Sequence, residues 1–448
     1  MTSPARVAAY ETLLAVESSR ADLPHALARA RQGLTDERDR ALAGEIATGT
    51  LRWQGAFDAV ICRFATRPLR HLDREVLVIL RLTMFQLLHL DRVPASAAVN
   101  DAVSLTRRAG KTSAAPMVNA ILRRVSRERD RLPLPTRPEP GADREALLQY
   151  LSVTLSHPRW LVERWLDRHG FENTERWAQF NNEPAKLTLR TNSLKARREE
   201  LADALSKAGV RTAPTRLAPD GLVVQQGNPL LTPLAGTGLF VVQEEASQLV
   251  ALMTGVKPGE VVLDACASPG GKTTAMAAAM TDRGTIVATD VRRNRIALLE
   301  STVAASGASH VHIVRADATA LPFGERFDCV LLDAPCSGLG TIRRDPDVKW
   351  RRTEFELSDL SAMQLRMLRA CAAVLKASGR VVYSTCSGEP EENEQVVRAF
   401  IAESGYREVP RADLPASARS LVNEQGHLRT YPFRDGVEAF FAAVLVRR

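Results

Sequence analysis

The sequence predicts a multidomain chain with an all-α domain, a small α+β subdomain and an α/β domain built on a doubly wound, Rossmann-like sheet. The chain has 448 residues with 45% hydrophobic content, enough to bury more than one core. Apolar positions follow helical spacing in the first third, whereas strand-like apolar runs alternate with helical patterns from about residue 236 onward. We therefore expect domains over 1–135, 151–235 and 236–448, with a proline-rich linker over 136–150.

The first domain is expected to be entirely helical and to bind a polyanion. Its apolar side chains recur three and four residues apart, as in Val7, Tyr10 and Leu13. Further helices are expected over 38–64 and 74–90 and from about residues 96 and 115. Residues 1–140 carry 22 Lys and Arg against 15 Asp and Glu, so nearly all of the net charge of +8 lies here. An excess of this kind favours RNA as a partner, although arginine-rich helix faces also occur simply as solvated surface.

The subdomain that follows combines strands and helices. Helices are expected around 157–169 and 197–208, and strands over 186–191 and near residues 222 and 239. Arg190 and Lys195 are candidate RNA contacts in this part of the chain.

In the third domain, an acidic or thiol side chain follows each of five expected strands. Asp264 ends the first strand, Asp290 the second and Asp317 the third, and Asp333 and Cys386 follow the fourth and fifth. Because parallel strands end at one edge of a sheet, these groups should line one crevice. The glycine-rich stretch 265–274 is not a nucleotide P-loop, since Cys266 stands where that motif requires glycine. Carboxylates in these positions favour S-adenosylmethionine as the cofactor.

Two of the six cysteines lie where chemistry is expected. Cys336 and Cys386 each follow a buried strand, among Pro, Ser, Thr and Gly residues. Cys62, Cys329 and Cys371 lie inside apolar patterns and are expected to pack in cores. There is no Cys-x-x-Cys pair and no tight His and Cys cluster, so we expect neither a disulfide framework nor a metal site.

Three blocks, Asp264–Thr274, Asp333–Gly340 and Tyr383–Glu394, resemble the motifs of RNA cytosine-C5 methyltransferases. The blocks Ala98–Val103 and Val118–Arg124 resemble the RNA-binding NusB family. Together with the stretch Ile342–Trp350, they indicate the bacterial small-subunit rRNA branch of these methyltransferases.

The resemblance assigns roles to individual residues. It implies that Cys386 adds to C6 of the cytosine, that Asp333 contacts the base and the cofactor, and that Cys336 assists loss of the C5 proton. The implied contacts to S-adenosylmethionine are Cys266, Ala267, Ser268, Pro269, Gly270, Gly271, Lys272, Asp290, Asp317 and Asp333. Arg343, Arg344, Lys349 and Trp350 are expected to hold RNA phosphate and to stack a base.

The interpretation is therefore an S-adenosylmethionine-dependent 16S rRNA methyltransferase that acts on cytosine C5. A tRNA substrate is the nearest alternative, and a non-catalytic RNA-binding or assembly factor is the alternative from another class. No signal segment and no apolar stretch long enough for a membrane span is present, so a cytoplasmic protein without membrane contact is expected. We also expect a monomer.

Overall fold

The computed structural model describes residues 2–65 and 68–448, without the side chain of Ser417. The chain forms two compact units. The first contains residues 1–184 together with 342–352, and the second contains 185–341 and 353–448. None of the helices within the described residues combines the length and the apolar character that a membrane crossing requires.

The first unit is helical, as the apolar spacing predicts. Its core gathers side chains such as Ile46, Phe57, Ile79 and Leu122, each at most 4% exposed. Helix α5 lies at the centre of this core, with eleven consecutive residues from Val76 to Gln86 buried. The helices are α1 Pro4–Glu17, α2 Leu23–Arg31, α3 Glu37–Arg52, α4 Gln54–Ala65, α5 Arg74–His89, α6 Ala95–Arg108, α7 Ala115–Arg127, α8 Arg144–Gln149, α9 Arg159–Asn182 and α14 Val348–Arg351.

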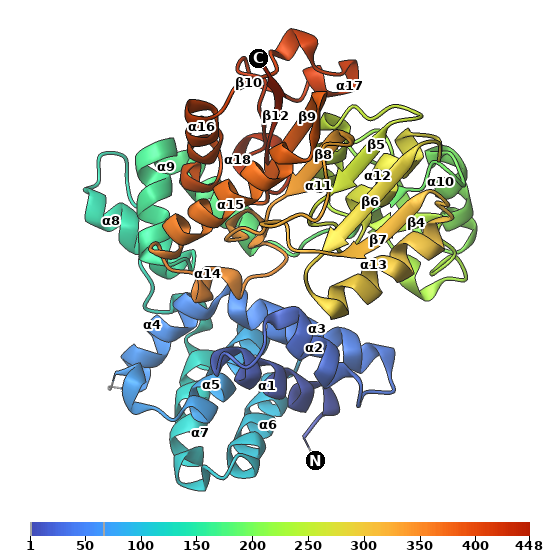
Figure 1. Cartoon of the computed structure of the whole chain (residues 1–448). Coiled ribbons are helices and arrows are strands. Elements are labelled where there is room, and N and C mark those ends of the chain that lie inside the picture. The colour runs from blue at the N-terminus through green and yellow to red at the C-terminus, as the bar shows by residue number, and fades with distance from the viewer. Residues whose placement is uncertain (1, 66–67) are drawn as a thin grey trace. The chain divides into compact units, whose positions relative to one another are not determined.

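Segment 342–352 belongs to the first unit although it follows the strand that ends at Asp333. Lys349 is fully buried and its Nζ donates to the carbonyl oxygen of Arg52 at 2.9 Å, while Trp350 Nε1 donates to Leu51 at 2.6 Å. Figure 1 shows this orange segment against the blue helices of the unit. The expectation that Lys349 holds RNA phosphate was therefore wrong, because its ammonium group is buried and hydrogen-bonded inside the protein. Trp350 is partly exposed, and the base stacking expected of its ring stays a prediction.

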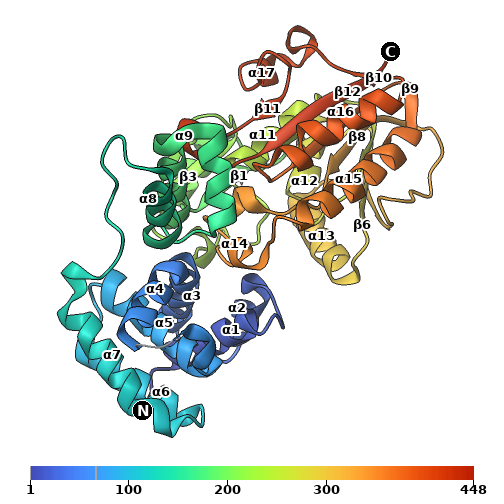
Figure 2. The ribbon, with the colours of Figure 1, turned by 90° about the vertical axis from the view of Figure 1, so that its left-hand side faces the viewer.

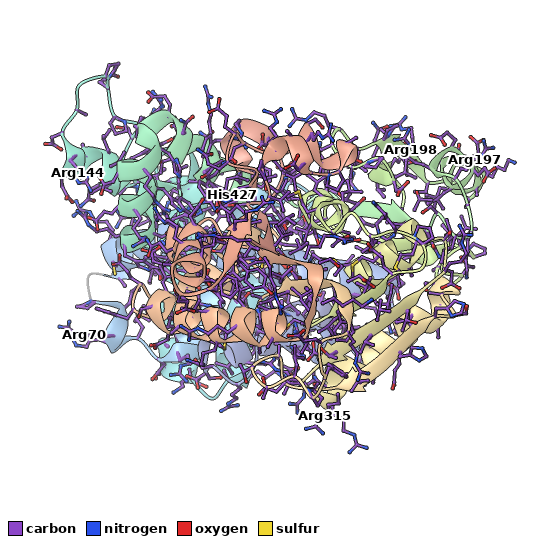
Figure 3. All side chains as sticks on the ribbon, turned by 45° about the horizontal axis from the view of Figure 1, so that its top comes forward. Arg70, Arg144, Arg197, Arg198, Arg315 and His427 are labelled. Carbon is purple, nitrogen blue, oxygen red and sulfur yellow. The ribbon has the colours of Figure 1, made fainter. Side chains whose placement is uncertain are left out.

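The second unit begins with a four-stranded antiparallel sheet of order β2-β3-β1-β4. Its elements are β1 Thr188–Thr191, α10 Arg198–Lys207, β2 Arg211–Pro214, β3 Gly221–Gln226 and β4 Phe240–Val242. Figure 3 shows Arg197 and Arg198 at the start of α10, where Arg197 is exposed. Arg190 is only 3% exposed, so it does not lie on the open surface of the subdomain, and its contact with RNA stays a prediction.

The large sheet has the order β10-β12-β9-β8-β5-β6-β7, with β11 paired to β12. Strands β5 to β9 pair in parallel, and β12 and β10 close one side in antiparallel fashion. This confirms the predicted Rossmann-like fold class. The strands are β5 Val261–Asp264, β6 Thr285–Asp290, β7 Val311–Arg315, β8 Phe327–Asp333, β9 Leu375–Thr385, β10 Tyr406–Glu408, β11 Leu428–Arg429 and β12 Phe441–Arg447.

Helices cover the sheet and bury two apolar clusters, one with Leu249 and Met276, the other with Leu368 and Phe400. Helices α15 and α16 lie side by side near β8 and β9 (Figure 2). The helices are α11 Glu245–Met253, α12 Gly271–Ala279, α13 Arg293–Ser306, α15 Glu356–Ala373, α16 Glu394–Glu403, α17 Ala416–Arg419 and α18 Pro432–Asp435. Cys329 and Cys371 are buried as expected, whereas Cys62 is exposed on α4.

The compact units group the chain differently from the domain boundaries read from the sequence. Helix α9 lies in the first unit, although the sequence places it in the subdomain over 151–235. The helix also extends past residue 169, where the sequence analysis ended it. The chain kinks at Gly170 (φ 73°) and then continues as a helix to Asn182. Strand β4 of the small sheet lies beyond residue 235. These differences arise from packing between distant segments, which local patterns do not report.

Candidate active site

The site lies where the parallel strands end. Asp264, Asp290 and Asp333 are the last residues of β5, β6 and β8. Helix α12 begins directly after the β5 loop, and Gly270 precedes its first residue with a left-handed φ of 103°. Such a conformation favours glycine, and the N–H groups of a helix's first turn are able to bind a polar or anionic group. The sheet register thus brings the predicted carboxylates to one edge.

Asp264 is buried beneath this loop. Its Oδ2 accepts a hydrogen bond from Thr273 Oγ1 at 2.7 Å, and its Oδ1 has no partner among the described residues. Burial raises the pKa of the Asp264 carboxyl to about 7, and the Thr273 hydrogen bond opposes this rise only in part. Asp264 therefore holds the start of α12 through Thr273, and its charge changes near neutral pH.

Asp290 and Asp317 differ in their surroundings. Asp290 is 4% exposed, and its Oδ1 accepts a hydrogen bond from the N–H of Arg292 at 3.1 Å. Its Oδ2 lies 3.7 Å from Arg295 Nη1, beyond hydrogen-bond distance. Asp317 is exposed, and its Oδ1 caps the turn that includes Thr319. Nearby, Arg315 projects away from the end of β7 (Figure 3). Asp290 is thus the buried carboxylate of the two.

Lys272 and Asp333 connect the β5 loop to the end of β8. The Nζ of Lys272 lies 2.6 Å from Asp333 Oδ2, and Asp333 Oδ1 accepts from Ser384 Oγ at 2.8 Å. Burial lowers the pKa of Lys272, but the charge of Asp333 and its hydrogen bond outweigh that effect, so the net pKa is raised. Lys272 therefore remains a cation beside Asp333. Sequence reasoning placed both residues in the site but did not predict this ion pair.

The two predicted thiols are adjacent. Cys336 Sγ and Cys386 Sγ are 3.2 Å apart, and both residues are partly exposed. The hydrogen bond to Cys386 raises the pKa of Cys336 well above that of a free thiol, and burial raises it further. Cys336 therefore stays protonated and is able to donate its S–H to Cys386. The predicted convergence of the fourth and fifth strand ends is thus visible at the level of single atoms.

Glu392 holds both thiol loops and was not found by sequence reasoning. Its carboxylate is fully buried. Oε1 accepts from the N–H of Ser337 at 2.7 Å and from Gln364 Nε2 at 3.1 Å. Oε2 accepts from the hydroxyls of Ser337 and Ser387, each at 2.6 Å. Because Ser337 follows Cys336 and Ser387 follows Cys386, one carboxylate fixes the two loops together. The run of acids after Pro390 was the available signal.

The Cys386 loop has two further anchors. Asn393 Nδ2 donates to the carbonyl oxygen of Ser387 at 2.9 Å. Gly340 N–H donates to the carbonyl oxygen of Cys386 at 3.0 Å. A Cβ at Gly340 would lie 2.8 Å from that carbonyl oxygen and 2.0 Å from the one of Ala439, so only glycine permits this approach. The backbone that carries Cys386 is therefore held from several sides.

The remaining residues of the predicted cofactor loop lie between β5 and α12. Cys266 is half-buried, Ala267 and Ser268 are buried, and Pro269 is exposed. Ser268 Oγ donates to the carbonyl oxygen of Arg295 at 3.0 Å, which joins the loop to α13. Burial raises the pKa of Cys266 well above its usual value, so this thiol is unreactive. Among the described residues, no group of three or more His, Cys, Asp or Glu side chains is arranged to hold a metal ion.

Comparison with family models gives three matches along the chain. Residues 251–446 match the model described as 16S rRNA methyltransferase RsmB/F. Residues 3–127 match the NusB family. Residues 157–230 match the RsmF/B-like ferredoxin-like domain. The N-terminal match confirms the resemblance of the helical region to NusB.

Similar proteins extend over nearly the whole chain. A protein of Bacillus subtilis named probable ribosomal RNA small subunit methyltransferase B is 34% identical over 412 residues, which covers 90% of this chain and 90% of the relative. The ribosomal RNA small subunit methyltransferase B of Pseudomonas putida is 32% identical over 431 residues, with 94% and 96% covered. The crystal structure of PH0851 superposes with a TM-score of 0.81 at 26% identity and covers 100% of both chains.

Proposed function

Because the chain belongs to the 16S rRNA methyltransferase RsmB/F family, we propose that it methylates C5 of a cytosine in 16S rRNA through a transient bond between Cys386 and C6 of the base. The chain is an S-adenosylmethionine-dependent rRNA methyltransferase. The observation that carries the finer proposal is the pair of thiols 3.2 Å apart, since C5 methylation of a pyrimidine needs a nucleophile at C6 and a group that assists loss of the proton from C5.

The residues present fit S-adenosylmethionine. The buried Asp290 has one carboxylate oxygen without a hydrogen bond, which suits a ribose hydroxyl. The loop from Cys266 to Lys272 and the first turn of α12 would hold the amino-acid part, and Asp317 would meet the adenine edge. When bound, the cofactor supplies a methyl group on a positively charged sulfur, which is reactive toward an electron-rich carbon.

The protein's own groups make C5 electron-rich. The Cys386 thiolate forms a bond to C6, which converts the C5–C6 double bond into an enamine that is nucleophilic at C5. The S–H of Cys336, 3.2 Å away, stabilises the thiolate before attack by hydrogen bonding. Asp333, fixed by Lys272 and Ser384, hydrogen-bonds the base at N3 or N4 as charge develops in the ring.

Release reverses the covalent step. Once C5 carries the methyl group, its proton must leave before the C5–C6 double bond can re-form and expel Cys386. Because Cys336 is protonated, it assists by hydrogen-bonding the water molecule that accepts the C5 proton, and Cys386 departs as the thiolate. The target base must be unstacked, because a thiol cannot reach C6 from the face of a helical stack.

The two thiols can be separated by a gel experiment. In the Cys336→Ala variant, Cys386 still attacks C6 and C5 of the base receives one methyl group, but the RNA then stays attached to the protein. Incubation with S-adenosylmethionine and 16S rRNA should therefore give a slow-migrating, nuclease-sensitive band on a denaturing gel. Cys386→Ala and the double variant should give none. Cys62→Ala, which removes an exposed thiol of the first unit, is the matched control and should turn over normally. A band from Cys386→Ala would exchange the two roles.

The substrate is tested independently of the mechanism. Bisulfite sequencing of rRNA and tRNA from a deletion strain should show the loss of a methylated cytosine in 16S rRNA alone. Loss of a methylated cytosine in tRNA instead would show that tRNA is the substrate. An unchanged methylation pattern together with RNA binding would favour the assembly-factor alternative.

A further inference from the structure

A cavity of about 180 Å³ lies in the second unit, between the small antiparallel sheet and helices α11 and α12. The five polar residues that line it are Arg190, Ser193, Asp220, Gln248 and Thr254. None of the residues proposed above for the cofactor or the thiol chemistry is part of its wall as described. The cavity is therefore distinct from the methyl-transfer site.

Arg190 brings an incompletely paired cation to this cavity. Its side chain is buried, and its Nε donates to Gln243 Oε1 at 2.8 Å. Its Nη2 donates to Thr274 Oγ1 at 2.7 Å and to the carbonyl oxygen of Gly271 at 3.2 Å. Within the described residues, Nη1 has no hydrogen-bond partner and no carboxylate lies within ion-pair distance of the guanidinium. Two N–H bonds of Nη1 thus remain available.

Acceptors line the same cavity. Gln248 is 4% exposed, and its Nε2 donates to the carbonyl oxygens of Leu189 and Gln243. Its Oε1 is buried without a partner among the described residues. Asp220 also lines the cavity, and its side chain forms no hydrogen bond or ion pair with any described residue. Buried polar groups in native proteins are almost always paired, so the unpaired Nη1 of the buried Arg190, beside the half-buried Asp220, points to a bound molecule.

The charges restrict the kind of molecule. An anion would be repelled by Asp220, and a cation would be repelled by Arg190. A neutral molecule with both acceptors and donors satisfies the two groups together. The other walls are apolar and include Leu252, Val256 and Ala275, which favour a ring. The volume is below the ~300–1,000 Å³ of sites that enclose whole ligands, so one ring system fits better than a complete nucleotide.

We propose that this cavity binds a guanine base. The two free N–H bonds of Arg190 Nη1 match the adjacent acceptors O6 and N7, which is the pairing by which arginine recognises guanine in nucleic acids. The Asp220 carboxylate, with two oxygens, matches the adjacent donors N1–H and N2–H₂. Adenine and cytosine each offer a single amino group as donor and so leave part of this set unpaired. The base belongs either to an unstacked nucleotide of the RNA or to a free nucleoside.

Binding of guanosine to the full-length protein tests the proposal without any methyl transfer. Saturating S-adenosylmethionine keeps nucleosides out of the cofactor site. Calorimetry should then show one guanosine per chain, with inosine, which lacks the 2-amino group, binding at least ~10-fold more weakly. A short RNA with a single guanine should compete with guanosine if the RNA supplies the base, and should not compete if the ligand is a free nucleoside.

Variants locate the binding without disturbing Arg190, which also supports the first turn of α12. Asp220→Asn should weaken guanosine binding at least ~10-fold, and Ala275→Phe should abolish it by filling the cavity. Asp203→Asn, an exposed aspartate on α10 in the same subdomain, is the matched control and should bind normally. Absence of guanosine binding, or binding that a folded Ala275→Phe variant retains, would overturn the proposal. Either result leaves the methyltransferase assignment intact.

Discussion

Replacing Glu392 by alanine should separate the two thiol loops without affecting cofactor binding. The carboxylate is the common acceptor for Ser337, which follows Cys336, and for Ser387, which follows Cys386. Among the described residues, Glu392 is the carboxylate that accepts hydrogen bonds from both the Cys336 loop and the Cys386 loop. Glu392 is therefore a positioning residue, which acts on the chemistry through the cysteines it aligns.

The magnitude follows from the bonds that are lost. The hydroxyls of Ser337 and Ser387 are 3.2 Å apart and can bond to each other once the carboxylate is gone. The N–H of Ser337 loses its acceptor, and Gln364 Nε2 keeps only the carbonyl oxygen of Pro335, at roughly 1–3 kcal/mol for each lost hydrogen bond. Removal of a buried carboxylate relieves its desolvation cost, so we expect the free energy of unfolding to fall by only about 2 kcal/mol. A shift of the thiols by ~1 Å should lower the methyl-transfer rate ~100-fold.

Single-turnover methylation, calorimetric titration with S-adenosylmethionine and urea unfolding together test this reasoning. Glu392→Ala should lose rate and keep its cofactor affinity. Glu392→Gln retains an acceptor for Ser337 and should recover most of the rate. Glu300→Gln, an exposed glutamate on α13, should match the wild type in all three measurements. A folded Glu392→Ala variant with the wild-type rate would refute the role assigned to this carboxylate.

Alkylation of Cys336 separates the effect of the Glu392 charge from that of its geometry. The pKa of Cys336 is raised first by the hydrogen bond to Cys386, then by burial, and also by the negative charges of Cys386 and Glu392. In a Cys386→Ala background, Glu392→Gln should therefore lower the pH at which Cys336 is alkylated by iodoacetamide. Equal alkylation profiles with and without the substitution would show that the carboxylate acts through geometry alone.

Three further predictions concern stability, cofactor binding and RNA binding. Burial raises the pKa of Asp264 from 3.8 to about 7, so the stability that its protonated form contributes is complete below about pH 4 and is lost as the pH rises through 7. The cofactor-free Asp264→Asn variant should lack this decline, and at pH 8 its free energy of unfolding in urea should exceed that of the wild type by up to about 4 kcal/mol. Equal pH dependences of the free energy of unfolding in the two proteins would contradict this prediction. Asp290→Ala should weaken S-adenosylmethionine binding by roughly 1.5–3 kcal/mol in calorimetry. If the variant bound the cofactor as tightly as the wild type, Asp290 would not contact the ribose. Replacing the exposed Arg127 and Arg131 by alanine should lower the salt dependence of RNA binding by about one unit of log–log slope each in filter-binding assays, and an unchanged slope would place the phosphate contacts elsewhere.

The sequence by itself determined the elements and the residues at the strand ends. Apolar runs locate β5, β6, β8 and β9, because a strand buried on both faces must be continuously apolar. Parallel pairing then places Asp264, Asp290, Asp333 and Cys386 at one edge, since the ends of parallel strands are aligned. The convergence of the two thiols follows from the same rule and required no knowledge of side-chain packing.

Only the tertiary structure decided which polar residues are satisfied inside the protein. Lys349 and Trp350 read as an exposed basic turn, but their hydrogen bonds run to backbone carbonyls nearly three hundred positions away in the chain. Arg190 reads as a surface arginine and is instead buried among Gln243, Gly271 and Thr274. Local patterns report periodicity and turn chemistry, whereas the burial of a polar group depends on which distant segment supplies its partner. For the same reason, the Glu392 bridge between the thiol loops and the cavity beside Gln248 became visible only once the chain was folded.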